Sequence, residues 1–167
     1  MAKTRPDIRV MLDANVLIAG SVWPRWPYEV LQHALSGDFQ LVLSPYVIAQ
    51  AEAQIAKSFP DNAWRFRQLI EGSNFELVKT PTKQQIEEAA GLVRDATDIP
   101  VALAAIDAKV DYLVSEDKDL TAQDETTKQL RDKLTVLLSG TFLREVMEWS
   151  SEELEGIRHR SWKDLEP

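Results

Sequence analysis

The stretch "RVMLDANVLIAGS", residues 9–21, decides the fold of this chain. Three apolar residues, Val10, Met11 and Leu12, form a run with the length of a short buried strand, and Asp13 follows them directly. A carboxylate at the end of a buried strand is costly unless it is paired or hydrogen-bonded. Asp13 therefore needs a partner or a function that the rest of the chain must supply.

The composition is that of an ordinary globular protein. The chain has 167 residues, of which 44% are hydrophobic and 28% charged, so we expect one domain with a continuous core. Cysteine is absent, which excludes disulfides, thiolate zinc sites and cysteine nucleophiles. No long apolar segment is present, so we expect a cytoplasmic protein that does not enter a membrane.

The charge balance is acidic. Lys and Arg number 19 against 27 Asp and Glu, which gives a formal net charge of -8. Such a surface repels nucleic acid unless bound cations or a local basic patch intervene. Any role in nucleic-acid chemistry therefore requires bound cations or a local basic patch, whereas the simplest function of the acidity is to keep the protein soluble.

Short runs rich in β-forming residues alternate with segments of helical periodicity. This alternation is typical of a parallel sheet covered on both faces. We therefore predict an α/β fold with three layers, α/β/α, around a mostly parallel central sheet of about five strands. The expected strands are residues 8–12, 39–43, 75–78, 111–114 and 134–138.

Several helix starts are readable from the sequence. Ser44 before Pro45 is a capping hydroxyl followed by a proline at the first helical position. Thr82 and Gln85 have the spacing of a capping box, and apolar residues at helical spacing predict a helix from there to Val93. Phe142, Val146 and Trp149 repeat at helical spacing in the same way. The Ala-rich residues 99–110 predict a helix packed closely on the sheet.

The chain divides near Trp149. Residues 1–149 are expected to form the single domain, and residues 150–167 a charged C-terminal helix or tail that starts with a capping box at Ser150 and Glu153. Docking of this segment on its own domain is the simplest expectation, and an arm that binds a partner is the alternative.

Acidic residues recur at the ends of the expected strands and helices. Asp13 follows one strand, Asp98 precedes the Ala-rich helix, and Ser115, Asp117 and Asp119 follow another strand. In an open parallel sheet the carboxyl ends of the strands form the ligand site. Each Asp alone is also explained as a helix cap or turn residue. Together they suggest an oxygen-only site for a hard cation such as magnesium or manganese.

These motifs, taken in order, resemble the PIN-domain family of metal-dependent ribonucleases, which includes the toxins of many toxin-antitoxin pairs. The resemblance is carried by "VMLDANVLIAG", "LVLSPYVIAQAEAQIAKSFP" and "DIPVALAAIDAKVDYLVSEDKDL". It implies that Asp13, Asp98 and Asp117 bind the metal and are catalytic. It assigns supporting places to Asn15, Ser44, Ser115 and Asp119.

One position departs from the family pattern. The family has a Glu about six residues beyond the Ser of the second motif, and counting from Ser44 this chain has Gln50 there. Glu52 lies two residues further on, about 200° round a helix. Three alternatives remain open: a site with three carboxylates, a helix register that lets Glu52 take part, or a fold that has lost its activity.

The resemblance implies a Mg²⁺- or Mn²⁺-dependent endoribonuclease that hydrolyses phosphodiesters in RNA, with an antitoxin protein and a second copy of the chain as possible partners. A degenerate PIN domain that acts as an interaction or RNA-binding module is the alternative. A phosphohydrolase of the haloacid-dehalogenase type is more remote, because its second acid would stand where this chain has Asn15.

An aromatic loop follows the first motif. Trp23, Arg25 and Trp26 lie in "SVWPRWPYE", residues 21–29, and side chains of this kind can stack on unpaired bases. The alternative is that the loop packs on the body of the protein or on another subunit.

Overall fold

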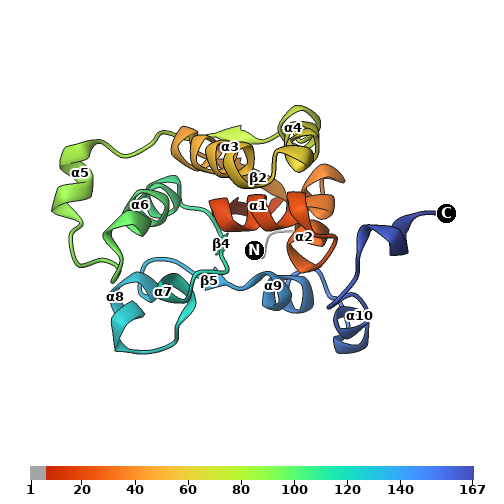
Figure 1. Ribbon diagram of the computed structural model, residues 1–167. Coiled ribbons are helices and arrows are strands. Elements are labelled where there is room, and N and C mark those ends of the chain that lie inside the picture. The colour runs from red at the N-terminus through yellow and green to blue at the C-terminus, as the bar shows by residue number, and fades with distance from the viewer. Residues whose placement is uncertain (1–6) are drawn as a thin grey trace.

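The computed structural model describes residues 7–167, so the first six residues of the expected domain lie outside the described part (Figure 1). Its centre is a five-stranded sheet with the strand order β3-β2-β1-β4-β5, in which all four neighbouring pairs are parallel. The predicted three-layer α/β fold is confirmed. The strands are β1 (Arg9–Leu12), β2 (Gln40–Leu43), β3 (Glu76–Leu77), β4 (Tyr112–Val114) and β5 (Val136–Leu137).

Helices connect and cover the strands. The α-helices are α1 (Ala14–Val22), α2 (Trp26–Leu35), α3 (Pro45–Ser58), α4 (Ala63–Gly72), α5 (Lys83–Glu88), α6 (Ile99–Ala108), α7 (Lys118–Thr121), α8 (Lys128–Arg131), α9 (Ser139–Glu145) and α10 (Ser151–Gly156). Short 3₁₀ turns are η2 (Pro60–Asn62), η3 (Ala96–Asp98), η4 (Glu125–Thr127) and η5 (Trp162–Leu165). Within residues 7–167, every helix is too short or too polar to cross a bilayer.

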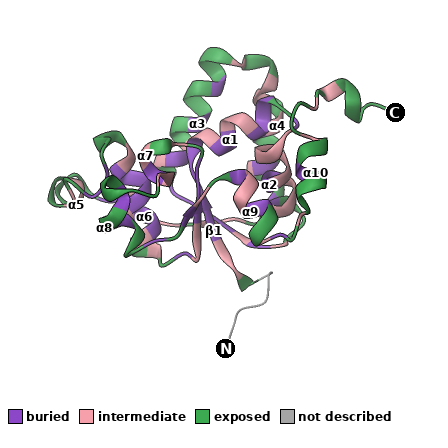
Figure 2. Ribbon diagram, turned by 90° about the horizontal axis from the view of Figure 1, so that it is seen from below, coloured by how far each residue is buried: buried purple, intermediate pink, exposed green. Residues whose placement is uncertain are grey.

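Strand β1 lies in the middle of the sheet, and its residues Val10, Met11 and Leu12 are fully buried. Met11 is in register with Val42 of β2 on one side and with Leu113 of β4 on the other. Helices lie on both sides of the sheet, and buried residues concentrate along the strands and inner helix faces (Figure 2). The chain moves outward from β1 to β3 and then returns to β4 on the other side of β1. The switch in strand order therefore lies between β1 and β4, where such folds bind ligands.

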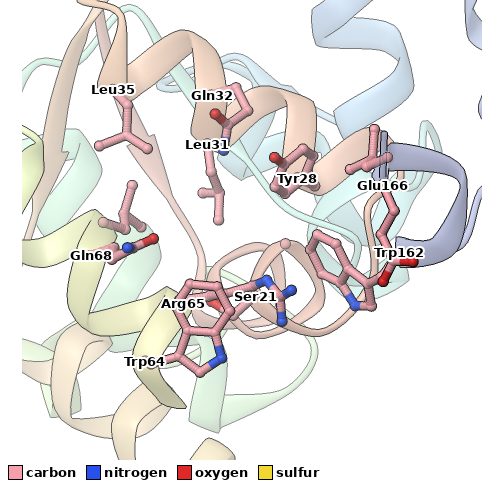
Figure 3. A pocket seen from close by; sticks show the side chains of 13 residues that line it. Ser21, Tyr28, Leu31, Gln32, Leu35, Trp64, Arg65, Gln68, Trp162 and Glu166 are labelled. Carbon is pink, nitrogen blue, oxygen red and sulfur yellow. The ribbon is translucent and has the colours of Figure 1, made fainter. Parts of the chain in front are cut away.

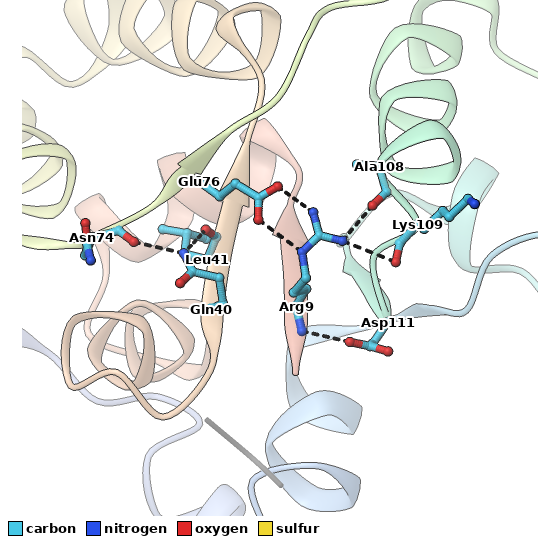
Figure 4. A network of polar contacts seen from close by, with 8 residues as sticks. All are labelled: Arg9, Gln40, Leu41, Asn74, Glu76, Ala108, Lys109 and Asp111. Atoms are coloured by element: carbon cyan, nitrogen blue, oxygen red, sulfur yellow. Dashed lines mark hydrogen bonds and ion pairs between the residues drawn. The ribbon is translucent and has the colours of Figure 1, made fainter. Parts of the chain in front are cut away.

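The amino-terminal edge of the sheet is tied by Arg9 (Figure 4). Its guanidinium donates to both carboxylate oxygens of Glu76 on β3 and to the carbonyl of Ala108 at 2.6 Å. The Arg9 amide donates to Asp111 Oδ2 at 2.8 Å. These contacts join β1, β3 and the end of α6 at the edge opposite the ligand site, so their role is structural.

The predicted helix caps are confirmed. Ser44 Oγ accepts a hydrogen bond from the Val47 amide at 3.3 Å at the start of α3. The capping box of Thr82 and Gln85 starts α5, and the box of Ser150 and Glu153 starts α10. These caps depend on residues three positions apart, which is why the local sequence was sufficient to predict them.

Two helices are shorter than their periodicity predicts. The helix expected from Thr82 to Val93 ends at Glu88, and the chain turns through Gly91, whose φ of 89° only glycine adopts at low cost. Helix α9 ends at Glu145, so Trp149 lies outside it. In both cases the apolar residues beyond the end still contact the core, from turns rather than from a helix.

The C-terminal segment packs on the domain. Trp162 in η5 donates its indole N–H to the Val22 carbonyl at 2.8 Å, and its ring meets Tyr28 edge-on with centroids 5.3 Å apart. The Arg65 guanidinium lies 3.5 Å from the centre of the Trp162 ring and 4.2 Å from that of Trp64. Figure 3 shows these side chains around a cavity of about 380 Å³ between α1, α2, α4 and η5.

Candidate metal centre

The carboxyl ends of β1 and β4 bring Asp13 and Ser115 together. The Asp13 amide donates to the Val114 carbonyl at 3.0 Å, which continues the parallel ladder by one residue. The side chain of Asp13 is 5% exposed, with Oδ1 accepting from the Ala14 amide at 2.8 Å and Oδ2 from the Ser115 hydroxyl at 2.8 Å. Burial raises the pKa of Asp13, and these hydrogen bonds oppose the rise.

Asn15 and Ser115 link Asp13 to the turn after β4. The Asn15 amide group donates to Asp13 Oδ2 at 3.2 Å, and its carbonyl oxygen accepts from the Glu116 amide at 3.1 Å. Ser115 Oγ accepts from the Asp117 amide at 3.0 Å. Asp117 caps the short helix α7 through a hydrogen bond from the Asp119 amide at 2.8 Å. This network fixes Asp13 and Asp117 relative to each other.

Asp98 is held differently. It stands at the N-cap position of α6, but its side chain makes no capping hydrogen bond. Its Oδ2 atom is buried without a hydrogen-bond partner. Burial and the neighbouring Asp117, with smaller contributions from Asp13 and Asp95, raise the pKa of Asp98 to about 8. A helix cap therefore does not explain Asp98, whose carboxyl group is crowded by a second carboxylate at the carboxyl end of the sheet.

Two further carboxylates border Asp98. One oxygen each from Asp95, Asp98 and Asp119 lie within 4.8 Å of one another. Asp95 Oδ1 accepts from the amide and the hydroxyl of Thr97, which lowers the pKa of Asp95. Asp119 Oδ1 pairs with the Arg94 guanidinium at 2.7 Å. The carboxylates of Asp13, Asp95, Asp98, Asp117 and Asp119 are called the acidic cluster below.

Helix α3 borders the acidic cluster through Tyr46. Burial raises the pKa of Tyr46, and the negative charges of Asp13, Asp98 and Asp95 raise it further, so its hydroxyl faces these groups. That hydroxyl donates to the Thr97 carbonyl at 3.3 Å. Gln50 is exposed and lies one turn beyond Tyr46, on the same side of α3.

Ser44 follows β2 as Asp13 follows β1, and Glu52 lies on α3. Ser44 is fully buried and caps α3, which accounts for its hydroxyl. Glu52 lines a separate cavity between α3 and α4, together with Ile55 and Phe66. Glu52 therefore lies on the side of α3 that faces α4, and this position does not favour the alternative in which the register of α3 brings Glu52 to the site.

The aromatic loop packs within the chain. Trp26 donates its indole N–H to the Leu154 carbonyl of α10 at 2.8 Å, and Arg25 donates to the Arg160 carbonyl at 3.2 Å. Trp23 is 41% exposed and meets Phe59 edge-on. These contacts support the packing interpretation for Arg25 and Trp26, and Trp23 remains partly exposed to solvent.

Asp95, Tyr46 and Arg94 were not predicted from the sequence to lie at this site. Asp95 precedes Asp98 by three residues, a spacing that a turn brings to one side, so its signal was present but weak. Tyr46 follows the Ser-Pro start of α3 and gave no signal of its own. Arg94 reaches Asp119 across 25 positions of sequence, and local patterns do not predict such a contact.

Comparisons with known proteins agree with this geometry. A family model described as PIN domain matches residues 9–119, which run from β1 through the acidic turn after β4. No curated protein sequence matches the chain closely enough to count as a relative.

Solved structures share the fold at low sequence identity. PAE2754 from Pyrobaculum aerophilum has a TM-score of 0.57 and 14% identity, over 88% of this chain and 100% of that one. VapBC2 from Rickettsia felis, solved bound to a DNA fragment from its promoter, has a TM-score of 0.54 and 17% identity, over 78% of this chain and 98% of that one. FitAcB from Neisseria gonorrhoeae has a TM-score of 0.52 and 17% identity, over 78% and 97%. With the family match over residues 9–119, these findings establish that the chain belongs to the PIN domain family.

Proposed function

We propose that this protein is a divalent-metal-dependent endoribonuclease, with Asp13, Asp98 and Asp117 as its metal-binding catalytic residues. The observation that carries this proposal is the carboxyl group of Asp98, which has one buried oxygen without a hydrogen-bond partner and lies beside a second carboxylate. Carboxylates crowded in this way repel one another unless a cation lies between them.

The donor set fits magnesium or manganese. The described residues around the acidic cluster offer carboxylate and amide oxygens, which hard cations prefer, and the chain has no cysteine. When bound, such an ion supplies Lewis-acid activation of water and neutralises charge that develops on the phosphate in the transition state. It also reverses the local potential of a protein with a net charge of -8, so that RNA can approach.

The residues of the chain contribute by positioning. Ser115 holds Oδ2 of Asp13 and the amide of Asp117 at the same time, and Asn15 ties Asp13 to the turn at Glu116. Groups that orient the ligands of a metal site in this way usually change metal affinity about 10- to 100-fold when they are removed. Asn15 and Ser115 are therefore proposed as supporting residues.

Asp95 can supply the carboxylate that the family pattern has at the position of Gln50. This residue lies in the acidic cluster beside Asp98 and Asp119. The amide of Gln50 can still accept a hydrogen bond or hold a water, but it adds no negative charge. We infer that the site works with Asp13, Asp98 and Asp117, assisted by Asp95 and Asp119.

The test is cleavage of labelled single-stranded RNA by the purified protein in Mn²⁺, in Mg²⁺ and in EDTA. Asp117→Asn is prepared alongside, with Asp107→Asn as the matched control, because Asp107 is an exposed carboxylate at the far end of α6. We expect cleavage that requires metal, disappears in Asp117→Asn and persists in Asp107→Asn. Cleavage that survives in EDTA or in Asp117→Asn would refute the proposed site.

A non-catalytic interaction or RNA-binding module is the second candidate, and Gln50 is the observation that favours it. This alternative predicts a folded protein that leaves RNA intact in either metal. The haloacid-dehalogenase alternative has no such support. The second acid of that mechanism would stand at Asn15, whose amide group donates a hydrogen bond to Asp13 and cannot protonate a leaving group.

We further propose that the protein is the toxin of a toxin-antitoxin pair. The support is membership of the PIN domain family and a fold shared with VapBC2 and FitAcB. Induced expression should then arrest growth, and co-expression of the gene next to it should relieve the arrest. Normal growth at high expression of the folded protein would exclude this role and leave the nuclease proposal unaffected.

A further inference from the structure

An open cavity of about 390 Å³ borders the acidic cluster. It lies between the turn that follows α5, the start of α6 and the 3₁₀ turn η4. Its size is within the range of about 300–1,000 Å³ that is common for small-ligand sites. Its described lining contains none of the carboxylates of the acidic cluster, so the cavity is distinct from the proposed metal centre.

The cavity has an apolar floor and small side chains at its rim. Val93 and Ile99 are 4% and 3% exposed and form the buried part of the lining. Ala90 and Ala96 are exposed and leave the entrance open. An apolar floor with short rim side chains suits a flat, weakly polar group, since such a group can lie against the floor without leaving buried polar atoms unpaired.

Polar groups stand at two sides of the entrance. Arg94 is 70% exposed and offers a planar guanidinium for stacking or hydrogen bonding. The Thr126 hydroxyl donates its proton to Asp124, so its oxygen remains available as an acceptor. The rim therefore presents a donor and an acceptor around an apolar floor, as the edges and the faces of a nucleobase require.

Arg94 also connects the cavity to the metal centre. Its guanidinium lies 2.7 Å from Asp119 Oδ1, and Ile99 in the cavity floor follows Asp98 directly in the chain. A base is joined to its own phosphate through a single ribose. The cavity is thus within reach of a base next to a phosphate held at the acidic cluster.

We propose that this cavity binds one unpaired nucleobase of the RNA, next to the phosphate at which the chain is cut. Val93 and Ile99 support the face of the base, and Arg94 covers or pairs with it. This inference rests on the proposed ribonuclease function and narrows its substrate to single-stranded RNA, because a base within a duplex is not free to enter a cavity. Arg94 and Ala90 are specificity residues in this arrangement.

The experiment measures the Kd of pentaribonucleotides by fluorescence anisotropy in the presence of Ca²⁺. The intact oligonucleotide is compared with a series in which the base is absent from one position at a time. We expect removal at one position to raise the Kd about tenfold or more, the size of effect expected for one stacked base. Ala90→Leu should fill the cavity, raise the Kd of the intact oligonucleotide to a similar degree and abolish the dependence on position. Gln84→Leu, at an exposed position of α5 outside the lining of the cavity, should bind as the wild type does.

The outcomes separate this inference from the proposed function, because cleavage in Mn²⁺ is measured independently. RNA that is cut, but bound equally well whichever base is missing, overturns the nucleobase site and leaves the nuclease proposal standing. RNA that is bound with the expected dependence but never cut supports the nucleobase site and refutes the nuclease. Ala90→Leu that binds as the wild type does, or a folded wild-type protein that binds no RNA, overturns the inference.

Discussion

At the scale of single residues, the network between β1 and β4 is built from short polar side chains with more than one partner each. Ser115 is fully buried, donates to Asp13 and accepts from the Asp117 amide. Asp98 lies beside this network without a comparable hydrogen bond to its buried oxygen. Substitutions of Ser115 and of Asp98 are therefore expected to have different effects.

Asp98→Asn should stabilise the metal-free protein at neutral pH. The pKa of Asp98 rises from 3.8 to about 8 on folding, chiefly through burial and Asp117. Between these values the folded protein binds more protons than the unfolded chain, so stability falls as the pH rises through this window. In EDTA, the melting temperature of Asp98→Asn should exceed that of the wild type by an amount that grows from about pH 4 to about pH 8. A constant difference across this range, or the same trend in Asp107→Asn, would contradict the expectation.

Ser115→Ala should weaken metal binding by about 10- to 100-fold, because Asp13 and the Asp117 amide lose the hydroxyl that orients them. The measurement is a calorimetric titration with Mn²⁺. Ser73→Ala is the matched control, because Ser73 is also buried and its hydroxyl donates only to the Leu69 carbonyl in α4. Equal affinities for Ser115→Ala and the wild type would remove Ser115 from the supporting residues.

At the scale of elements, the first helices after β1 depend on the C-terminal segment. Trp162 of η5 bonds to the end of α1 and packs against Tyr28 of α2, and α10 accepts a hydrogen bond from Trp26. Arg160 is largely buried and faces Glu29, with its Nη2 atom 3.6 Å from the carboxylate. The contacts of residues 150–167 therefore hold the C-terminal segment against α1 and α2, and they join elements from the two ends of the chain.

Trp162→Ala should lower the free energy of unfolding by about 1–3 kcal/mol, since it removes a half-buried ring together with its hydrogen bond and its contact with Arg65. Lys163→Ala, at the next and exposed position, should change it by less than about 0.5 kcal/mol. Urea denaturation of the three proteins provides the measurement. Equal stabilities would mean that the C-terminal segment does not stabilise the domain.

At the scale of the whole molecule, the net charge of -8 and the acidic cluster should have separable effects on how added ions change the stability of the protein. General repulsion is screened by any salt, whereas a built site responds to specific ions. The acidic cluster lies at the middle of the sheet, where β1 and β4 meet, so a bound ion would connect elements from both halves of the chain.

Mn²⁺ or Mg²⁺ should therefore raise the melting temperature of the wild type by mass action. At a hundredfold excess over the Kd the gain is about 2.7 kcal/mol, or about 5–10 °C for a domain of this size. KCl at equal ionic strength should reproduce little of this shift, and Asp13→Asn should lose most of it. A melting temperature that is flat in millimolar Mn²⁺, or a shift that KCl matches, would count against a metal centre.

The sequence alone determined the strand and helix alternation, the capping boxes and the positions of Asp13, Asp98 and Asp117 at element ends. These features depend on periodicity and on contacts within about four residues, which a sequence displays directly. It overestimated the helices that end at Glu88 and Glu145, because apolar residues in turns imitate helical spacing when they also face the core.

Tertiary structure decided the rest. Whether Asp98 caps α6 or meets Asp117, whether Trp26 faces RNA or α10, and whether Glu52 reaches the site all depend on how distant elements pack. The cavity at Arg94 likewise exists only because the turn after α5 returns to η4 and Asp119. Such contacts join residues from about twenty to more than a hundred positions apart, where the energy of packing overrides any local preference.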